Sequence, residues 1–260
     1  MLEEILGRQA LCVAFQPIFD LASGEVYAHE VLGRADPELL GAPAPGPLEL
    51  VDLAVASDKL LDLEHGWRTA AVDAIARYSP QGDSRFFLNV DTRILSDARF
   101  VPGTTRSLLD ARDLNPRRFV FELTERDPHL GARRLAELLP HYSCQGFGIA
   151  LDDLGAGHAS LHVMVQLRPE IVKLDREMCQ DVSVDPWRKH LIHALSRFCF
   201  QTGIALVAEG IETPADLETL RSIGVRYGQG FLLGMPRPEP LPTRRRLTMA
   251  KAPPLRLVGS

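Results

Sequence analysis

Two adjacent aspartates, Asp152 and Asp153, close the apolar run "GIALDD", and a glycine-rich turn follows them at once. Neighbouring carboxylates repel each other, and burial strengthens that repulsion unless cations neutralise it. Other strand-like runs in the chain also end on, or close to, a polar side chain that can coordinate a metal or exchange a proton. These side chains belong to Glu30, Asn89, Glu122, Lys173, Glu209 and Gln229.

The elements that must position these residues alternate between two kinds. Eight short runs rich in β-branched and aromatic residues predict strands, and segments with helical periodicity separate most of them. Such alternation over roughly 250 residues indicates an α/β fold of the TIM-like barrel type. Only "DLASG" separates the first two runs, too little for a crossover helix, so the first strand is predicted to be antiparallel to the others. The predicted strands are residues 11–19, 25–32, 86–90, 118–125, 148–153, 171–175, 204–210 and 226–233.

Helical patterns fill the remaining gaps between the predicted strands. In the last of them Thr213 is the predicted N-cap, Pro214 the first helical residue and Gly224 the stop signal. The predicted helices are residues 47–60, 63–78, 128–142, 186–203 and 213–224.

The carboxyl-terminal ends of barrel strands meet at one face, where the active sites of TIM barrels lie. Five carboxylates would therefore come together at that face. They can all stay ionised at close range only if cations join them, so we expect a metal site, with two ions. Ligation by carboxylate oxygens and one amide suits hard ions such as Mg²⁺ or Mn²⁺ rather than zinc or copper. The five carboxylates are those of Glu30, Glu122, Asp152, Asp153 and Glu209.

A simpler interpretation exists for each acid, as the N-cap of the next helix or as a solvated loop residue. For any single position this interpretation is at least as good as metal binding, but it does not explain why seven predicted strands end in this way. Lys173 is stronger evidence for a functional site, because a lysine inside "IVKLD" of a central strand is rarely buried without a partner. Its alternative role, a charge that protects an edge strand, has no use in a closed barrel.

The bulk composition narrows the class of protein. The 260 residues are 45% hydrophobic and 24% charged, which is typical of a soluble globular protein. No apolar run approaches a membrane span and the N-terminus lacks a signal-peptide pattern, so a cytoplasmic location is expected. The net charge of −5 argues against nucleic-acid binding, and four widely spaced cysteines indicate neither a zinc site nor a disulfide framework. The barrel is predicted over residues 1–240 and a solvated Pro/Arg-rich tail over 241–260.

The motifs, in their order, resemble those of the EAL-domain family of cyclic-di-GMP phosphodiesterases, from "FQPIFDLASGEV" to "GQGFLLGMP". "HEVLGR" stands where the family has its signature Glu-Ala-Leu, which implies that Glu30 binds metal and that Arg34 contacts the substrate phosphate. "FLNV", "FELTER", "LDDLGAG", "IVKLD", "VAEGIET" and "GQGFLLGMP" supply the remaining family positions. The polar catalytic set implied by the resemblance is complete.

The resemblance implies hydrolysis of one ester bond of cyclic-di-GMP to linear pGpG, which lowers the level of this bacterial second messenger. Two Mg²⁺ or Mn²⁺ ions would activate the attacking water and stabilise the leaving oxygen. The implied roles are first-ion ligands for Glu30, Asn89, Glu122 and Asp152, second-ion ligand for Asp153, base or second-ion ligand for Glu209, and water-holding for Lys173. Arg34 and Gln229 fall on the substrate side, Gln229 as a support of the network, and Glu125 steadies the glycine-rich loop.

The chain departs from the family pattern at positions around this set. Val31 replaces the signature alanine, and Gly33 precedes Arg34 where a larger apolar residue is usual, so Arg34 is expected to be held less firmly. Leu154, His158 and Ala159 differ in the glycine-rich loop, which in the family links the metal site to a dimer interface. The resemblance implies a homodimer formed beside this loop, and the apolar residues of 158–167 serve either that interface or packing within the monomer.

Two other functions remain open at this point. The first is a receptor or scaffold that binds cyclic-di-GMP without cleaving it, and the second is an unrelated metal-dependent lyase or hydrolase built on a TIM barrel. A receptor that has lost catalysis usually lacks metal-site residues, and here they are all present. Hydrolysis is therefore the favoured interpretation.

Overall fold

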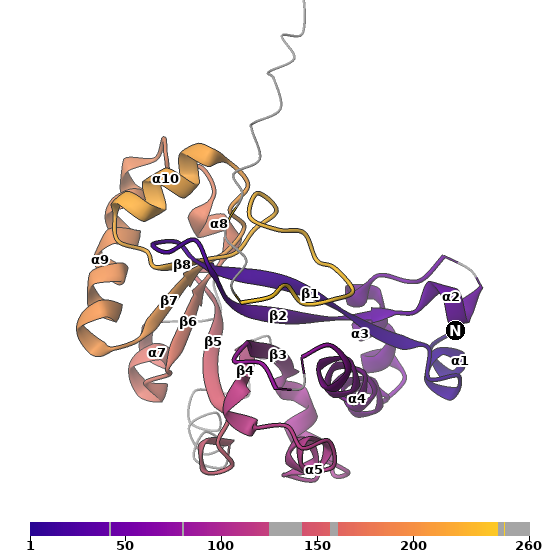
Figure 1. Ribbon diagram of the computed structural model, residues 1–260. Coiled ribbons are helices and arrows are strands. Elements are labelled where there is room, and N and C mark those ends of the chain that lie inside the picture. Colours follow the sequence, from indigo (N-terminus) through magenta and orange to yellow (C-terminus); the bar gives the residue numbers. More distant parts are fainter. Residues whose placement is uncertain (42, 80, 125–141, 157–160, 244–246, 248–260) are drawn as a thin grey trace, which may run out of the picture.

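Eight strands close into a barrel at the centre of the protein (Figure 1). The computed structural model describes residues 1–41, 43–79, 81–124, 142–156, 161–243 and 247. The strands are β1 (Leu11–Asp20), β2 (Val26–Ala35), β3 (Arg85–Asp91), β4 (Phe119–Thr124), β5 (Gly148–Leu154), β6 (Ile171–Leu174), β7 (Ala205–Ala208) and β8 (Tyr227–Gly228).

Each strand pairs with its neighbours in sequence, and β1 pairs with β8 to close the barrel. β1 is antiparallel to both β2 and β8, and the other pairs are parallel. The prediction of a TIM-like barrel with a reversed first strand is therefore confirmed. The last strand is shorter than predicted, because the chain turns after Gly228 and Phe231 lies half exposed outside the sheet.

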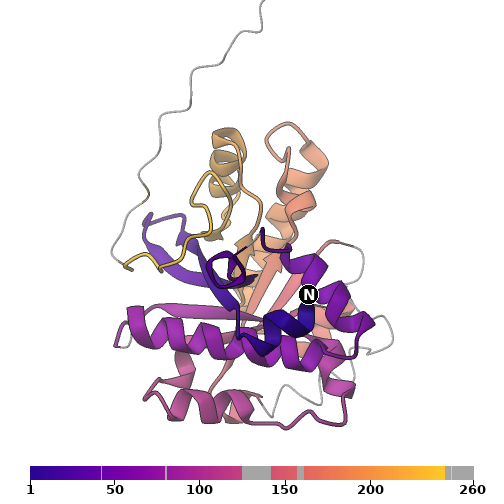
Figure 2. The ribbon, with the colours of Figure 1, turned by 90° about the vertical axis from the view of Figure 1, so that its right-hand side faces the viewer.

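Helices surround the barrel on its outer side. The longest helix of the described residues, α4, packs against β1, β2 and β3 and is seen end-on in Figure 1 and lengthwise in Figure 2. None of the helices in the described part of the chain has the length and apolar character needed to cross a membrane. The helices are α1 (Leu2–Gly7), α2 (Pro37–Leu40), α3 (Pro47–Ala56), α4 (Leu60–Tyr78), α5 (Thr104–Asp110), α7 (Leu161–Leu167), α8 (Arg176–Cys179), α9 (Pro186–Thr202) and α10 (Pro214–Ser222), with 3₁₀ turns η1 (Thr92–Ser96) and η2 (Pro116–Arg118).

The predicted boundaries of α10 are confirmed by its caps. The Thr213 hydroxyl accepts a hydrogen bond from the Asp216 amide at 3.1 Å, and Pro214 begins the helix. Gly224 follows the helix with a φ of +88°, a conformation that costs glycine little. Residues 128–141 of the helix predicted before β5 lie outside the described residues.

An apolar layer fills the barrel interior. Each of the eight strands contributes one buried residue to it, so the layer is continuous around the barrel axis. Side chains alternate in direction along a strand, so the residue two positions further along points to the same interior. The layer consists of Ile18, Ala28, Phe87, Val120, Ala150, Ile171, Val207 and Tyr227.

The chain after β8 returns to the β1–β2 hairpin. Phe15 and Arg237 exchange backbone hydrogen bonds of 2.7 and 3.0 Å, and the Leu241 amide donates to Nε2 of buried His29 at 2.9 Å. Further on, the Leu247 amide donates to the Gly24 carbonyl at 2.7 Å. This segment braces the strand that carries Glu30.

Candidate active site

A polar layer lies directly above the apolar layer of the barrel. Two positions beyond each apolar residue stands a polar one, on strands β2 to β6 and directly after the last residue of β7 and of β8. Strand pleating directs both side chains to the interior. On the reversed strand β1 the corresponding residue, Gln16, precedes Ile18 and pairs with Glu30 across the ladder. The structure therefore brings together the residues predicted from the strand ends. The layer from β2 to β8 is Glu30, Asn89, Glu122, Asp152, Lys173, Glu209 and Gln229.

Lys173 lies at the centre of this layer with its side chain only 1% exposed. Its Nζ lies 2.7 Å from Glu122 Oε1, 3.2 Å from Asp152 Oδ1 and 2.5 Å from Glu209 Oε1. A fourth carboxylate oxygen, Glu30 Oε2, lies 3.7 Å away. Burial lowers the Lys173 pKa, but the surrounding carboxylates, Asp152 and Glu122 foremost, raise it well above its ordinary value. The lysine therefore stays charged, and it has the charged partners that were expected for a lysine buried in a central strand.

Two amides hold the Glu30 carboxylate from opposite sides. Asn89 Nδ2 donates to Oε1 at 3.1 Å, and Gln229 Nε2 donates to Oε2 at 2.6 Å. Burial alone would raise the Glu30 pKa, but Lys173 and these two donors outweigh burial and lower the pKa below its ordinary value. Glu30 is therefore ionised at neutral pH.

The pKa values of Glu122 and Glu209 are shifted in the opposite direction. Burial raises the pKa of Glu122 well above its ordinary value, and Lys173 only partly offsets it. Burial likewise raises the pKa of Glu209 to about 8, with Asp152 and Glu30 adding repulsion. One lysine thus does not fully offset the burial and mutual repulsion of these carboxylates.

The remaining negative charge fits divalent cations. Neither oxygen of Glu122 receives a hydrogen bond of good geometry from a described residue, nor does Oδ1 of Asp152. One carboxylate oxygen from each of Asp152, Asp153 and Glu209 lies within 4.8 Å of the others. Carboxylate oxygens at this spacing, beside the buried carboxylate of Glu122, form the kind of ligand set that hard divalent ions prefer. Asp153 reaches this group from a backbone φ of +55°, an uncommon conformation of the kind found at functional sites.

A cavity of about 330 Å³ opens over the polar layer. Its floor includes Glu30, Asn89, Asp152, Asp153, Lys173 and Glu209, and its walls include Arg34 together with residues of α3 and α4. Glu122 and Gln229 lie below this lining. Gln229 contacts Glu30 through the 2.6 Å hydrogen bond and does not line the cavity.

The backbone of Arg34 is held by α4, which corrects the expectation drawn from Gly33. The Trp67 indole occupies the space beside Gly33, where an added Cβ would lie 2.4 Å from the ring. Trp67 Nε1 also donates to the Arg34 carbonyl at 3.0 Å. The guanidinium of Arg34 folds back, with Nη1 donating to the Gly33 carbonyl at 2.8 Å, at the wall of the cavity. The small residue is matched to a large one on the helix, so the Arg34 main chain is not loosely held.

Sequence reasoning missed two charged residues of the cavity wall, Glu64 and Arg68 on α4. They form an ion pair of 2.9 Å with side chains only 11 and 12% exposed. Burial raises the pKa of Glu64 to about 7, although Arg68 opposes the shift. The available signal was their position in the apolar stripe of the predicted helix, where Leu63, Trp67 and Ala71 are their neighbours.

Three residues named from the sequence lie outside the described part of the chain. They are Glu125, predicted to steady the glycine-rich loop, and the loop residues His158 and Ala159. Leu154 is buried at the end of β5, and Val31 is buried next to Glu30.

Comparisons with known proteins agree on one family. The model of the EAL domain matches residues 1–236 of this chain. The probable cyclic di-GMP phosphodiesterase PdeB of Escherichia coli (strain K12) is 28% identical over 248 residues, which is 92% of this chain and 45% of PdeB. The chain thus spans about half the length, or less, of the curated relatives PdeB and PA2567, a cyclic di-GMP phosphodiesterase of Pseudomonas aeruginosa.

Solved structures give the same result. Complexes of Klebsiella pneumoniae BlrP1 with cyclic-di-GMP and calcium, and with cyclic-di-GMP and manganese, are both 26% identical to this chain. Their TM-scores are 0.79 and 0.78. The matches cover 89 and 88% of this chain, and 57 and 56% of the BlrP1 chains.

Proposed function

Because the chain belongs to the EAL domain family, we propose that it is a metal-dependent phosphodiesterase that hydrolyses one ester bond of cyclic-di-GMP and releases linear pGpG. The observation that carries the proposal is the polar layer, in which four carboxylates surround one buried lysine and the second oxygen of Glu122 receives no hydrogen bond from a described residue. The relatives named as phosphodiesterases and the BlrP1 complexes with cyclic-di-GMP support the same substrate.

The ligand set proposed for two Mg²⁺ or Mn²⁺ ions follows the layer. Glu30, Glu122 and Asp152, with the side-chain oxygen of Asn89, would hold one ion, and Asp153 with Glu209 would hold the other. When bound, the ions supply an activated water and neutralise charge that develops on the phosphoryl oxygens. Asn89 can contact Glu30 and the first ion at the same time. Its Nδ2 donates to Glu30 at 3.1 Å, and its Oδ1 is the metal-facing atom in this assignment.

The protein's own residues divide the remaining work. Lys173 Nζ, held 2.5 Å from Glu209 Oε1, orients the attacking water and stabilises negative charge on the phosphoryl group. The Glu209 carboxylate, at the floor of the cavity, accepts the proton of that water. Arg34, at the cavity wall, binds a substrate phosphate with its guanidinium.

The experiment that tests this proposal identifies the products formed by the purified chain from cyclic-di-GMP. With Mn²⁺ or Mg²⁺ we expect linear pGpG, and with excess chelator no product. With Ca²⁺ we expect binding without cleavage, since Ca²⁺ takes looser geometry and longer bonds, which misplace the attacking water. A sample that binds cyclic-di-GMP in both Ca²⁺ and Mn²⁺ and cleaves it in neither would instead support a receptor.

A matched pair of variants separates the site from the rest of the surface. Asp153→Asn should abolish cleavage, whereas Asp52→Asn, at an exposed position of α3, should leave it unchanged. Retained cleavage in Asp153→Asn would refute the assignment of the second ion. We also propose that the protein forms a homodimer beside the glycine-rich loop, which sedimentation of the active species tests.

A further inference from the structure

An ion pair between Glu64 and Arg68 lies within the apolar face of α4. The two residues are one helical turn apart, their side chains are 11 and 12% exposed, and Arg68 Nη2 lies 2.9 Å from Glu64 Oε2. The Arg68 guanidinium also stacks over Phe121 at 5.1 Å from the ring centroid. Both charges are thus largely removed from water, in a position where most helices of this kind place apolar residues.

Stability does not account for such a pair. Removing two charges from water carries a large desolvation cost, and replacement of buried pairs by apolar residues is often neutral or stabilising. The pair therefore calls for a reason other than the free energy of folding, and its remaining contacts indicate one.

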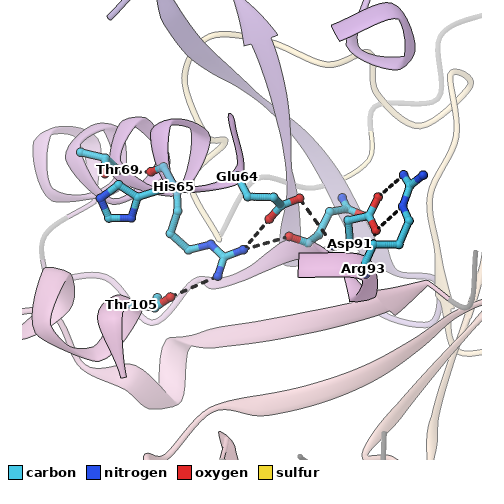
Figure 3. Close-up of polar contacts among 8 residues, drawn as sticks. Glu64, His65, Thr69, Asp91, Arg93 and Thr105 are labelled. Atoms are coloured by element: carbon cyan, nitrogen blue, oxygen red, sulfur yellow. Dashed lines mark hydrogen bonds and ion pairs between the residues drawn. The ribbon is translucent and has the colours of Figure 1, made fainter. Parts of the chain in front are cut away.

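Both residues form hydrogen bonds at the end of β3, and Figure 3 shows Glu64 beside Asp91. Arg68 Nη2 donates to the Asn89 carbonyl at 3.3 Å, and Nη1 donates to Thr105 Oγ1 at 3.1 Å. On the other side of the pair, Glu64 Oε1 accepts a hydrogen bond from the Asp91 amide at 3.4 Å. The pair thus holds one peptide group on each side of Val90, directly where the strand presents Asn89 to the cavity.

The ion pair adds to the β3–β4 ladder, which runs to Asp91 and Thr124. Glu64 and Arg68 line the cavity over the polar layer, and they also line a second cavity of about 320 Å³ between α4, η1 and α5. The ion pair is therefore part of the wall between two hollows. The Asn89 side chain itself is exposed to the first cavity, and the hydrogen bond to Glu30 is its described polar contact.

We propose that Glu64 and Arg68 are positioning residues that fix the end of β3, so that the Asn89 side chain holds Glu30 and faces the metal site. This inference rests on the proposed function, because it assigns the pair to the same metal site. Residues outside a metal's ligand set that orient its ligands typically change affinity or activity about 10–100-fold when they are replaced. The pair would act through Asn89, without touching metal or substrate.

A double-mutant cycle on Mn²⁺ affinity, measured by calorimetry without nucleotide, tests the proposal. In the variant Glu64→Leu/Arg68→Leu we expect a melting temperature in chelator equal to or above that of the wild type, and a loss of Mn²⁺ affinity of about tenfold. In an Asn89→Ala background the same double change should cost almost nothing further, because its effect passes through Asn89. Arg68→Lys, which keeps the charge, should recover part of the affinity.

The control is an exposed ion pair of the same spacing between Glu4 of α1 and Arg8, the residue that caps this helix, whose double leucine variant should keep its Mn²⁺ affinity. Unchanged Mn²⁺ affinity in the α4 variant, or a loss that adds fully to that of Asn89→Ala, would overturn the positioning role. Failure of the proposed function is distinguishable. A wild-type chain that shows the coupling but cleaves no cyclic-di-GMP supports the positioning role and refutes the proposed function.

Discussion

Replacement of Lys173 by methionine removes the one cation that the described polar layer contains. Four carboxylate oxygens lie between 2.5 and 3.7 Å from its Nζ, and the side chain is 1% exposed. Methionine matches the length of the lysine stem without the charge, so the change tests charge compensation more than packing. The carboxylates of Glu30, Glu122, Asp152 and Glu209 would then face one another without a counter-ion.

The expected magnitude follows from two opposing effects. Removal of one partner from a buried ion pair costs about 3–5 kcal/mol, because the other charge remains buried. Protonation of Glu122 and Glu209, whose pKa values are already raised, relieves part of this cost. We therefore expect a loss of about 3 kcal/mol in metal-free protein, a fall in melting temperature of about 6–12 °C at this chain length.

The pH dependence of the loss follows from the direction of the pKa shifts. A carboxyl group whose pKa is raised in the folded state stabilises that state while it is protonated, and this contribution disappears as pH rises through the folded pKa. For Glu209 the window runs from its ordinary pKa of 4.5 to about 8, and loss of Lys173 moves its upper limit higher. The deficit of Lys173→Met should therefore be small at pH 5.5 and large at pH 8.5.

Thermal melting in chelator and in millimolar Mn²⁺ measures this effect. Mn²⁺ should restore much of the lost stability, because bound cations take over the neutralising role of the lysine. Lys189→Met, at an exposed position of α9, is the matched control and should melt as the wild type does. Equal melting of Lys173→Met and wild type in chelator at pH 8.5 would refute the view that Lys173 compensates the carboxylates.

Three further outcomes are expected. Asp153→Asn should lose cleavage by at least about a thousandfold, which product analysis measures. Its melting temperature, followed by circular dichroism, should change little because asparagine tolerates the positive φ at this position. Mn²⁺ affinity should rise between pH 6.5 and 8.5, because metal must displace the proton of Glu209, and calorimetry in buffers of different ionisation enthalpy should detect protons released on binding. Gly33→Ala should displace the Trp67 ring, which would lie 2.4 Å from the added Cβ. We expect a loss of about 1–3 kcal/mol in the free energy of unfolding and a change in indole fluorescence. An unaltered fluorescence spectrum would contradict the close packing.

The barrel and its polar layer were predictable because both depend on local patterns. Strand pleating has a period of two residues, so a polar residue two positions beyond a buried apolar one must share its side of the sheet. The link between the first two strands, too short for a helix, determined the direction of β1 in the same local way. The strand predicted at 226–233 was wrong beyond Gly228, because apolar composition alone does not distinguish a short strand from a buried turn.

The support of the site from α4 was not predictable, because it depends on contacts between residues far apart in the chain. Gly33 taken alone indicates a loosely held Arg34, and only the position of Trp67 on the helix shows that the indole fills the missing volume. Glu64 and Arg68 taken alone form a common i, i+4 pair of a solvated helix face. Their burial depends on which face of α4 packs against the barrel. The spacing of apolar residues predicts that face only approximately, because the apolar stripe of a helix is broad.

The reversed first strand explains why this helix carries so much of the positioning. A regular barrel places a crossover helix between each strand and the next, whereas the β1–β2 hairpin has a turn there, so α4 packs against β1, β2 and β3 together. Within little more than one turn, its residues Glu64, Trp67 and Arg68 bind the backbone at the ends of β2 and β3. A shift of α4 would therefore move Arg34 and Asn89 at the same time, which couples the arginine of the cavity wall to a predicted metal ligand through one rigid element. Substitutions on this face of α4 should consequently change metal affinity and nucleotide binding together, whereas substitutions on the outer face of α9, which packs on β7, should change neither.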